Sequence, residues 1–369
     1  MKKMIYYHPH SISENPSKGS ELRPKKMKEA FQNIGYTVDL VAGNSLQRKK
    51  AIKNIKSEIK KGVYYNFLYA ESSNMPIPLA DTHHFPIRLL LDYNFFRFLN
   101  QNNIPIGFFY RDLYWRVDEL KKKVSYLKFI PKQAFHWLEW YGVAKTVNHL
   151  FVPTKSMAKY FPTDWPEERF SALYPGCEPV SSKISKINYK NNKLKLFYVG
   201  GVKPPYYDLT PLIKTVNELD GFDLTLCCRQ KDWEVDSHYY SHLNFDQVNI
   251  VHANSSEIVK FYMEADIFFD IRKPEGYLQN TIPIKVIESL GYEVPLLLMD
   301  GTEAADFVKR ENAGWIVENI YEAKKLLNKL RKNRDKIVDK VNHIGKINKK
   351  HTWKKRAEKA GGILKNSAE

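Results

Sequence analysis

The N-terminal stretch reads KMIYY at residues 3–7, LRPKKMKEAFQNI at residues 22–34 and TVDLV at residues 37–41. The first and last runs are short and apolar, as expected of buried strands, whereas the middle run repeats apolar residues at helical spacing. Gly35 follows the helical run directly, and glycine often ends a helix. The stretch therefore predicts a β-α-β unit, the building block of a parallel sheet.

The same alternation of apolar runs and helical segments continues along the chain. Further buried strands are predicted at residues 64–69, 106–110, 150–152, 194–199, 224–228, 249–251, 267–271 and 295–299. Strands that alternate with helices favour parallel sheets with helices on both faces. Residues 178–192 are poor in apolar side chains and separate two such series. We therefore expect an α/β protein with two doubly wound, Rossmann-like domains, residues 1–180 and 181–352, that face a cleft.

The chain of 369 residues carries 58 Lys and Arg against 41 Asp and Glu, a formal net charge of +17. This excess favours anionic partners such as nucleic acid, lipid headgroups or phosphate esters. No zinc-finger or RNA-recognition signature accompanies the charge, so we expect no nucleic-acid partner. The three cysteines show neither a disulfide nor a zinc-binding spacing, and no signal peptide or membrane-spanning apolar run is evident. These features indicate a cytoplasmic protein.

The most informative motif follows the predicted strand at residues 267–271. This strand leads into Arg272, and a helix opens near Pro283. Lys285 and Glu288 are three positions apart in the helix and so project from one face. The helix amides and Lys285 would attract the phosphates of a nucleoside diphosphate, and Glu288 would accept hydrogen bonds from its ribose hydroxyls. The alternative is an ion pair between the two side chains on a solvated helix.

The run NTIPIKVIESLG at residues 280–291 resembles the nucleotide-sugar motif of glycosyltransferases with the GT-B fold, close to family 4. Three further segments are similar to that family and follow in its order. They are a glycine loop at residues 18–24, a first strand and loop of the nucleotide domain at residues 197–201, and the start of a closing helix at residues 352–353. The resemblance spans nearly the whole chain, and it implies that the closing helix, about residues 353–369, returns to the first domain.

The resemblance implies a site for a nucleoside diphosphate sugar, which we expect to be UDP-linked, and no other cofactor. Glu288 would bind the ribose of this donor, and the amides of the two glycine loops would lie near its diphosphate. The residues assigned to donor binding are Glu288, Asn280, Gly200, Gly201, Lys203, Arg229, Gly19 and Ser20. For Lys203 and Arg229, a solvated loop charge is the alternative.

The sequence departs from the family at two places. The family has a second glutamate where this chain has Asn280, and an arginine where it has Gly201. We expect two cations, Arg272 and Lys285, to stabilise the leaving diphosphate. No Asp-x-Asp sequence is present, so we expect metal-independent transfer and assign no metal ligand.

The run FFYRD at residues 108–112 is a predicted strand that ends in Arg111 and Asp112, at the edge expected to face the cleft. The family commonly has a His-Asp pair here, near the transferred sugar, so Asp112 matches and Arg111 departs. Asp112 would be the general base on the acceptor hydroxyl if the enzyme inverts, and would orient that hydroxyl if it retains, the outcome we favour. The alternative is a structural role in capping the next helix.

Residues 113–150 interleave aromatic and basic side chains, a combination typical of helices at a membrane interface. The residues expected to contact the acceptor or an anionic membrane surface are Arg111, Lys121, Lys122, Lys123, Trp137 and Trp140. The alternative is an ordinary amphipathic helix packed on the sheet.

Together these features predict a cytoplasmic glycosyltransferase at the inner face of the membrane, which moves a sugar from a nucleoside diphosphate to a glycan or lipid-linked acceptor. Two alternatives stay open. The net charge also fits a non-enzymatic protein that binds polyanions or nucleic acid. A nucleotide-sugar epimerase of the same fold would need acid and base groups in the cleft.

Overall fold

The computed structural model describes residues 2–16, 19–117, 126–180, 193–272 and 276–367. The chain divides into two compact units. The first unit contains Met1–Tyr174 and Trp353–Glu369, and the second contains Pro175–Thr352. The chain therefore leaves the first unit ahead of the apolar-poor stretch at residues 178–192 and comes back to it with its last helix.

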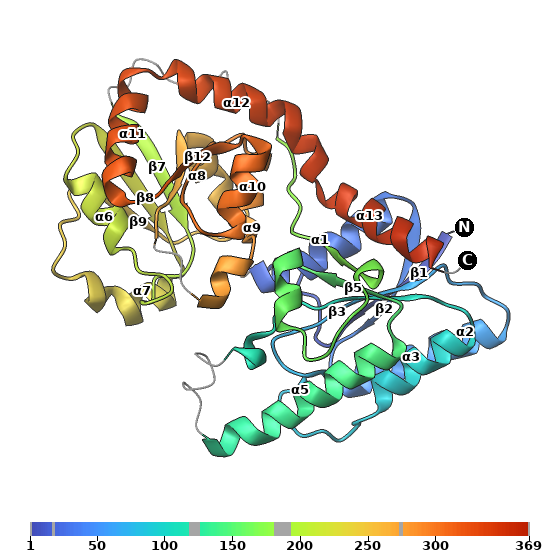
Figure 1. Cartoon of the computed structure of the whole chain (residues 1–369). Coiled ribbons are helices and arrows are strands. Elements are labelled where there is room, and N and C mark those ends of the chain that lie inside the picture. The colour runs from blue at the N-terminus through green and yellow to red at the C-terminus, as the bar shows by residue number, and fades with distance from the viewer. Residues whose placement is uncertain (1, 17–18, 118–125, 181–192, 273–275, 368–369) are drawn as a thin grey trace. The chain divides into compact units, whose positions relative to one another are not determined.

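The first unit is built on a six-stranded sheet of order β2-β1-β3-β4-β5-β6, in which all pairs are parallel (Figure 1). Its strands are β1 (Lys2–His8), β2 (Tyr36–Ala42), β3 (Leu68–Glu71), β4 (Ile106–Phe109), β5 (His149–Val152) and β6 (Phe170–Ala172). The strand order changes direction between β1 and β3, because the chain goes from β1 to β2 and then crosses to the other side of β1. Ligands of such sheets bind at the carboxyl ends of the strands beside this reversal.

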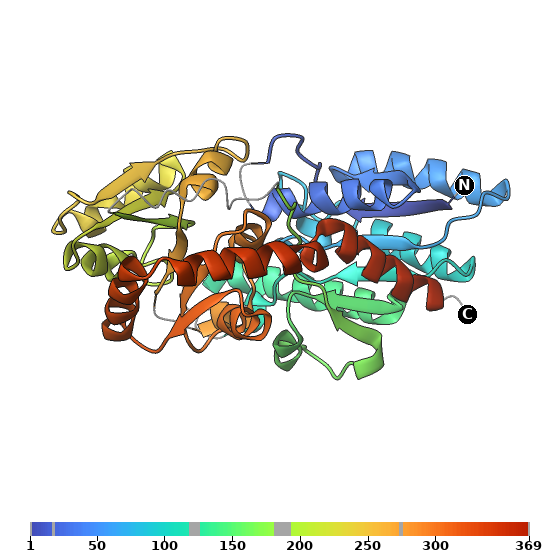
Figure 2. The same ribbon diagram turned by 90° about the horizontal axis from the view of Figure 1, so that it is seen from above.

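Helices cover both faces of the first sheet. They are α1 (Gly19–Asn33), α2 (Ser45–Lys60), α3 (Leu91–Gln101), α5 (Tyr126–Thr146) and α13 (Trp353–Asn366), with 3₁₀ helices at Ile77–Leu79, Tyr114–Arg116, Lys155–Tyr160 and Glu167–Arg169. Helices α1 and α13 pack together on one face, and α2, α3 and α5 cover the other. Figure 2 looks down on the first of these faces and shows α13 in front of the sheet. The core on this face includes Trp353, Ala357, Ala360 and Leu364 of α13.

The second unit has a parallel sheet of order β12-β11-β10-β7-β8-β9. Its strands are β7 (Leu194–Val199), β8 (Phe222–Cys227), β9 (Val248–Val251), β10 (Ile267–Asp270), β11 (Leu296–Met299) and β12 (Gly314–Val317). Its helices are α6 (Thr210–Asn217), α7 (Gln230–Asp236), α8 (Ile258–Glu264), α9 (Ile284–Gly291), α10 (Glu303–Glu311), α11 (Ile320–Lys332) and α12 (Asp335–Ile347), with 3₁₀ helices at Ser237–Tyr240, Gly276–Asn280 and Asn348–His351. Here too the strand order reverses, between β7 and β10.

The predicted β-α-β unit at the N-terminus is confirmed. Helix α1 leads into β2 through Gly35, whose φ of 90° lies in the left-handed region that glycine occupies without strain. The other predicted strands are also present, although β3 begins at Leu68 rather than at residue 64, where the ring of Tyr64 lies in solvent. Strands β6 and β12 were not predicted. The α/β architecture with two doubly wound sheets is as the sequence predicts.

Candidate functional site

A charged cluster of the second unit forms where β10 ends and α9 begins. Asp270 is the last residue of β10, Arg272 follows two positions later, and Lys285 lies in the first turn of α9. Strand β10 pairs with β7, and parallel neighbours end at the same edge of a sheet. The loop after β7, which starts with Gly200 and Gly201, therefore lies beside the cluster.

The two cations share one carboxylate. Arg272 donates from Nε and Nη2 to the two oxygens of Asp270, at 2.5 and 2.6 Å, and Lys285 Nζ donates to Asp270 Oδ2 at 2.8 Å. Arg272 Nη1 also donates to the carbonyl of Tyr206 at 2.8 Å. Because two positive groups face one negative group, the cluster has a net positive charge. The ammonium of Lys285 is thus largely buried against Asp270 and does not lie on a solvated helix face.

Aromatic rings and glycines shape the surroundings of the two cations. Lys285 Nζ lies 4.3 Å from the ring centroid of Tyr198, and Arg272 Cζ lies 5.3 Å from it, within the range of cation–π attraction. The Tyr198 hydroxyl donates to the carbonyl of Gly201 at 2.8 Å. A Cβ atom on Gly200 would lie only 3.1 Å from Lys285 Nζ. Glycine at this position therefore leaves the backbone free to approach the ammonium group.

The charges in the cluster change one another's pKa values. Burial alone would raise the pKa of Asp270, but Arg272 and Lys285 hold it well below its usual range. Burial and then Arg272 lower the pKa of Lys285 to about 8, although Asp270 acts in the opposite direction. Lys285 is therefore mainly protonated at neutral pH. An anion that approached the cluster would stabilise the charged form of this lysine further.

Glu288 lies one turn further along α9. The hydroxyl of Tyr262, which is buried, lies 3.5 Å from Glu288 Oε2 and 3.5 Å from the carbonyl of Lys285. Asn280 ends the 3₁₀ helix before α9 and is almost fully buried. The residues of the predicted motif thus lie on consecutive segments around the end of β10.

The first unit has a cavity of about 420 Å³. The residues that line it include His8, His10, Ser20, Glu21, Asn74 and Arg111. They come from the ends of β1 and β4, the start of α1 and the loop after β3, so the cavity lies at the strand edge where the order of the sheet reverses. This is the place where doubly wound sheets bind ligands.

Arg111 connects the segments around this cavity. Its Nη1 donates to the carbonyl of Ser20 at 3.3 Å, next to Gly19 at the start of α1, and its backbone N–H donates to Ser72 Oγ at 2.9 Å. Arg111 Nε lies 3.3 Å from Asp112 Oδ2. Burial raises the pKa of Asp112 to about 6, although Arg111 opposes this shift. A carboxyl group with this pKa can exchange protons near neutral pH.

No family model and no curated protein matches the sequence, whereas solved structures match it over nearly its full length. HepE of Anabaena, solved with UDP and glucose, is similar with a TM-score of 0.64 at 12% identity, over 98% of each chain. The sucrose-phosphate synthase of Thermosynechococcus elongatus gives 0.64 at 11% identity, over 99% of each chain. WaaG, a glycosyltransferase of lipopolysaccharide biosynthesis, gives 0.60 at 13% identity, over 98% of this chain and 99% of WaaG. The chain has the GT-B fold.

The GT-B fold predicted from the resemblance is therefore confirmed, and the narrower likeness to family 4 stays a prediction. In this GT-B chain, two of the predicted donor-site cations have other partners. Lys203 Nζ lies 3.7 Å from Asp236 and is 64% exposed, and Arg229 Nη2 lies 2.6 Å from Asp232 and is 51% exposed. These contacts fit the alternative of solvated loop charges.

The tryptophans predicted to meet a membrane have different environments. Trp140 is fully buried, its Nε1 donates to Thr163 Oγ1 at 2.9 Å, and its ring packs against Tyr110. The expectation of a surface contact therefore does not hold for Trp140, because its ring is buried against other aromatic rings, those of Phe161 and Trp165 included. Trp137 is partly exposed and stacks on Tyr141 at 5.7 Å.

Lys121, Lys122 and Lys123 lie outside the described residues. In the part of the GT-B chain that is described, no helix has the length and apolar character needed to cross a membrane.

The carboxylate at the centre of the cluster, Asp270, was not among the predicted site residues. Asp270 lies within the predicted strand at residues 267–271, where it is the one charged residue of IFFDI. A charged residue at the carboxyl end of a buried parallel strand of a GT-B domain is a signal for a functional edge. Tyr198, which lies beneath both cations, gave no such signal because aromatic residues are common in buried strands.

Proposed function

We propose that this chain is a glycosyltransferase that moves a sugar from a UDP-linked donor to a glycan or lipid-linked acceptor without a metal ion. The observation that carries the proposal is the cluster of Arg272 and Lys285 around Asp270, beside the loop of Gly200 and Gly201. The cluster has a surplus positive charge, and backbone amides lie nearby. A diphosphate is the kind of group that such an arrangement binds.

Transfer breaks the bond between the sugar's anomeric carbon and the diphosphate and forms a bond from that carbon to an acceptor oxygen. Negative charge on the diphosphate grows as its bond breaks, so Lys285 and Arg272 would stabilise the transition state more than the ground state. Glu288 would accept hydrogen bonds from the donor ribose. Asp112 would take the proton of the acceptor hydroxyl if the reaction inverts, or orient that hydroxyl if it retains, which we favour.

The neighbours support the choice of donor and acceptor. HepE of Anabaena was solved with UDP-glucose as well as with UDP, so a UDP-linked donor is the first to test. WaaG takes part in lipopolysaccharide biosynthesis, so a lipid-linked acceptor is among the first to test. We propose a cytoplasmic enzyme at the inner face of the membrane, with an anionic lipid surface as its partner.

Titration calorimetry with UDP and with UDP-glucose, combined with an assay of UDP release in the presence of candidate acceptors, tests the proposal. We expect UDP to bind, and we expect UDP release that depends on an acceptor. A chain that bound DNA or heparin but no nucleoside diphosphate would be a polyanion-binding protein instead. Conversion of the donor sugar without any acceptor would identify an epimerase.

A further inference from the structure

An apolar loop of the first unit lies in solvent between the 3₁₀ helix at Ile77–Leu79 and α3. It reads THHFPIRLL, residues 82–90. Phe85 is 69% exposed, Ile87 is 65% exposed and Leu90 is 51% exposed. Isolated apolar residues are common on protein surfaces, but several large ones in one short segment mark a site of contact with an apolar partner.

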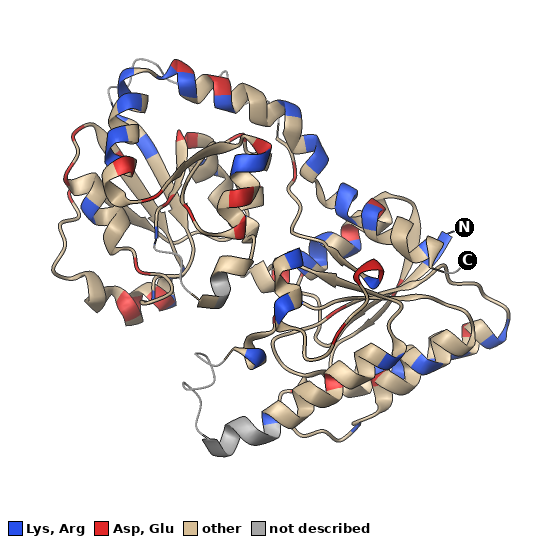
Figure 3. Ribbon diagram, viewed as in Figure 1, with Lys and Arg blue, Asp and Glu red and all other residues tan. Residues whose placement is uncertain are grey.

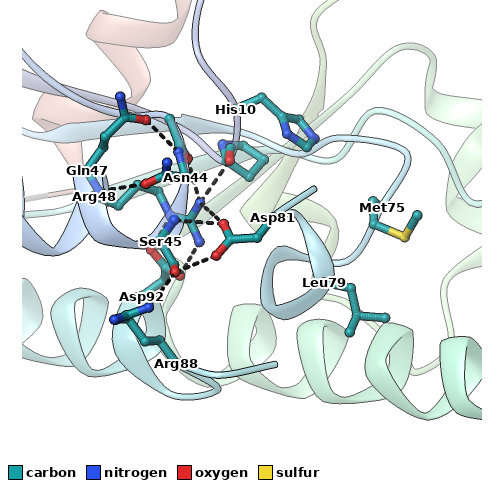
Figure 4. A network of polar contacts seen from close by, with 12 residues as sticks. His10, Asn44, Ser45, Gln47, Arg48, Met75, Leu79, Asp81, Arg88 and Asp92 are labelled. Carbon is teal, nitrogen blue, oxygen red and sulfur yellow. Dashed lines mark hydrogen bonds and ion pairs between the residues drawn. The ribbon is translucent and has the colours of Figure 1, made fainter. Parts of the chain in front are cut away.

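Both ends of this loop are bound to the first turns of α2 (Figure 4). At the N-terminal end, Asp81 accepts hydrogen bonds from the backbone N–H and the hydroxyl of Ser45, at 2.7 and 2.5 Å. At the C-terminal end, Asp92 accepts two hydrogen bonds from Arg48, from Nε at 3.0 Å and from Nη2 at 3.1 Å. Arg88, inside the loop, donates to the same Ser45 hydroxyl at 3.0 Å.

Arg48, which holds the C-terminal end of the loop, is itself buried and bonded to other segments. Arg48 is 2% exposed, and its Nη1 donates to the carbonyls of Pro9 and Gly43 at 2.8 and 2.7 Å. Charge-assisted bonds of this kind hold their partners in fixed positions. The exposed side chains of the loop therefore stand on a fixed base, and their exposure is not the result of a loosely held segment.

The surface next to the loop is positively charged. Leu46 follows Ser45 at the start of α2 and is 59% exposed. Lys49, Lys50 and Lys53 come next on α2, and all three are exposed. The only acidic residue of this helix is Glu58, near its other end, and Figure 3 shows the blue segments along α2. The loop and the first turns of α2 thus combine exposed apolar groups with cations.

We propose that the loop of residues 82–90 inserts into the surface of an anionic lipid bilayer, with the lysines of α2 at the level of the headgroups. Apolar and aromatic side chains beside lysines are the combination that binds such a surface, because the apolar groups enter the acyl boundary and the cations meet acidic lipids. A second copy of this chain would bring the same lysines against each other. The inference rests on the membrane-held acceptor of the proposed function, but its surface lies outside residues 113–150.

Vesicle flotation tests the apolar part of the surface. The parent should bind vesicles of phosphatidylcholine with phosphatidylglycerol, and the double variant Phe85→Ser with Ile87→Ser should bind them at least about tenfold more weakly. Tyr64→Ser is the matched control, since Tyr64 is 66% exposed on the same unit but outside the loop. The loop variant should melt close to the parent's temperature because both side chains are mostly exposed, and the ring contact of Phe85 is with His83 of the same loop. Equal binding by the parent and the loop variant would overturn the proposal, and so would a parent that binds no vesicles.

The charged part of the surface has its own variant. Lys49→Gln with Lys50→Gln should weaken binding about fivefold per lysine at low salt, and the difference should shrink as salt is added. The control pair Lys325→Gln with Lys332→Gln removes the same charge from exposed positions on the second unit. If the two pairs of substitutions weakened vesicle binding equally, net charge alone would explain the attraction. The lysines of α2 would then not contact the membrane in the way proposed.

A fluorescent label gives direct evidence of insertion. All three native cysteines are buried, so a Phe85→Cys variant can be labelled selectively with an environment-sensitive dye. Its emission should shift to the blue when acidic vesicles are added, whereas the dye on a Tyr64→Cys variant should not respond. A response at both positions or at neither would contradict insertion of the loop.

Two further measurements distinguish membrane insertion of the loop from the proposed function and from dimerisation through the loop. UDP binding by the loop variant should equal that of the parent, so a chain that binds vesicles through the loop but binds no UDP would retain this inference and lose the proposed function. Light scattering measures the oligomeric state. If the parent dimerises and the loop variant is a monomer with unchanged vesicle binding, the loop is an interface between two copies and the proposal fails.

Discussion

Each unit buries a cluster of charged side chains at the edge of its sheet, but the two clusters have opposite balances of charge. Around Asp270 in the second unit, two cations share one carboxylate. Around Arg48 in the first unit, the carboxylates of Asp92 and Asp81 lie 3.0 and 4.0 Å from one guanidinium. The surplus of cations around Asp270 suits a site that receives an anion. The cluster around Arg48 instead uses its charges to join segments of the chain.

The partners of the two arginines show the same difference. Arg48 donates to Asp92 and to two backbone carbonyls from separate segments. Its guanidinium is therefore bonded to groups inside the protein. Arg272 and Lys285 converge on a single carboxylate beside a glycine loop. A buried charge is therefore informative about function only when its balance with neighbouring charges is known.

The largest effect is expected from Arg48→Met. Removal of the guanidinium leaves Asp92 buried without its partner and removes the bonds to Pro9 and Gly43, so the free energy of unfolding should fall by about 3–5 kcal/mol. Urea denaturation followed by circular dichroism measures this change. Lys49→Met, one residue away but exposed, is the control and should stay within about 0.5 kcal/mol of the parent.

If both variants were equally stable, Arg48 would not join the segments that it contacts, and the contrast between the two clusters would be lost. The same experiment also bears on the loop of residues 82–90, because Arg48 holds one of its ends.

A smaller effect on stability and a larger one on binding are expected in the second unit. Lys285→Ala leaves the two bonds between Arg272 and Asp270 in place, so the protein should remain folded. A charge-assisted contact contributes about 1.5–3 kcal/mol, so the Kd for UDP should rise tenfold or more. Glu288→Ala should raise the Kd for UDP by a similar factor, because it removes the contact with the ribose. Turnover at saturating donor should fall further in Lys285→Ala than in Glu288→Ala.

Calorimetry and steady-state kinetics on the two variants measure these effects. Unchanged UDP binding and turnover in both would place the donor site elsewhere in the chain.

A third, more modest effect is the pH dependence of UDP binding that follows from the protonation of Lys285. Its pKa is lowered to about 8, chiefly by burial, so part of the population loses this proton as the pH rises through that value. A bound diphosphate favours the charged lysine and raises its pKa, so UDP binding should take up a proton near pH 8 and weaken above it. Calorimetry in two buffers with different ionisation enthalpies counts the protons. The uptake should vanish in Lys285→Ala, and an unchanged uptake in that variant would assign it to another group.

The smallest effect is expected from chelation. If Arg272 and Lys285 supply the positive charge that the leaving diphosphate needs, UDP release should proceed at the same rate with and without EDTA. The assay is the one that measures turnover. Activity that disappears in EDTA and returns with magnesium or manganese would show that the cations of this cluster are insufficient by themselves.

The sequence predicts most of this fold because its parallel strands are buried on both faces and are therefore continuous apolar runs. Strand β7 (Leu194–Val199) was predicted to the residue. Strand β6 (Phe170–Ala172) has three half-buried residues, too few to show a pattern. Strand β12 (Gly314–Val317) is an edge strand and mostly half-buried, so its apolar signal is also weak.

The candidate site was less accessible to sequence reasoning, because its geometry joins residues that are far apart in the chain. The spacing of Lys285 and Glu288 indicated a helix face, but only the folded chain shows that Lys285 pairs with Asp270. Aromatic residues carried a similar ambiguity. Trp137 and Trp140 both lie in a basic and aromatic segment, yet one is partly exposed and the other is in the core.

The return of α13 to the first unit affects how the chain is made. Ribosomes synthesise from the N-terminus, so the first unit must wait for Trp353 and Leu364, which complete its core, until the whole second unit has been translated. The second unit is continuous and can fold as soon as it leaves the exit tunnel. Nascent chains that stop at Thr352 should therefore have a protease-sensitive first unit and a resistant second one. Resistance of both would show that the first unit folds without its last helix.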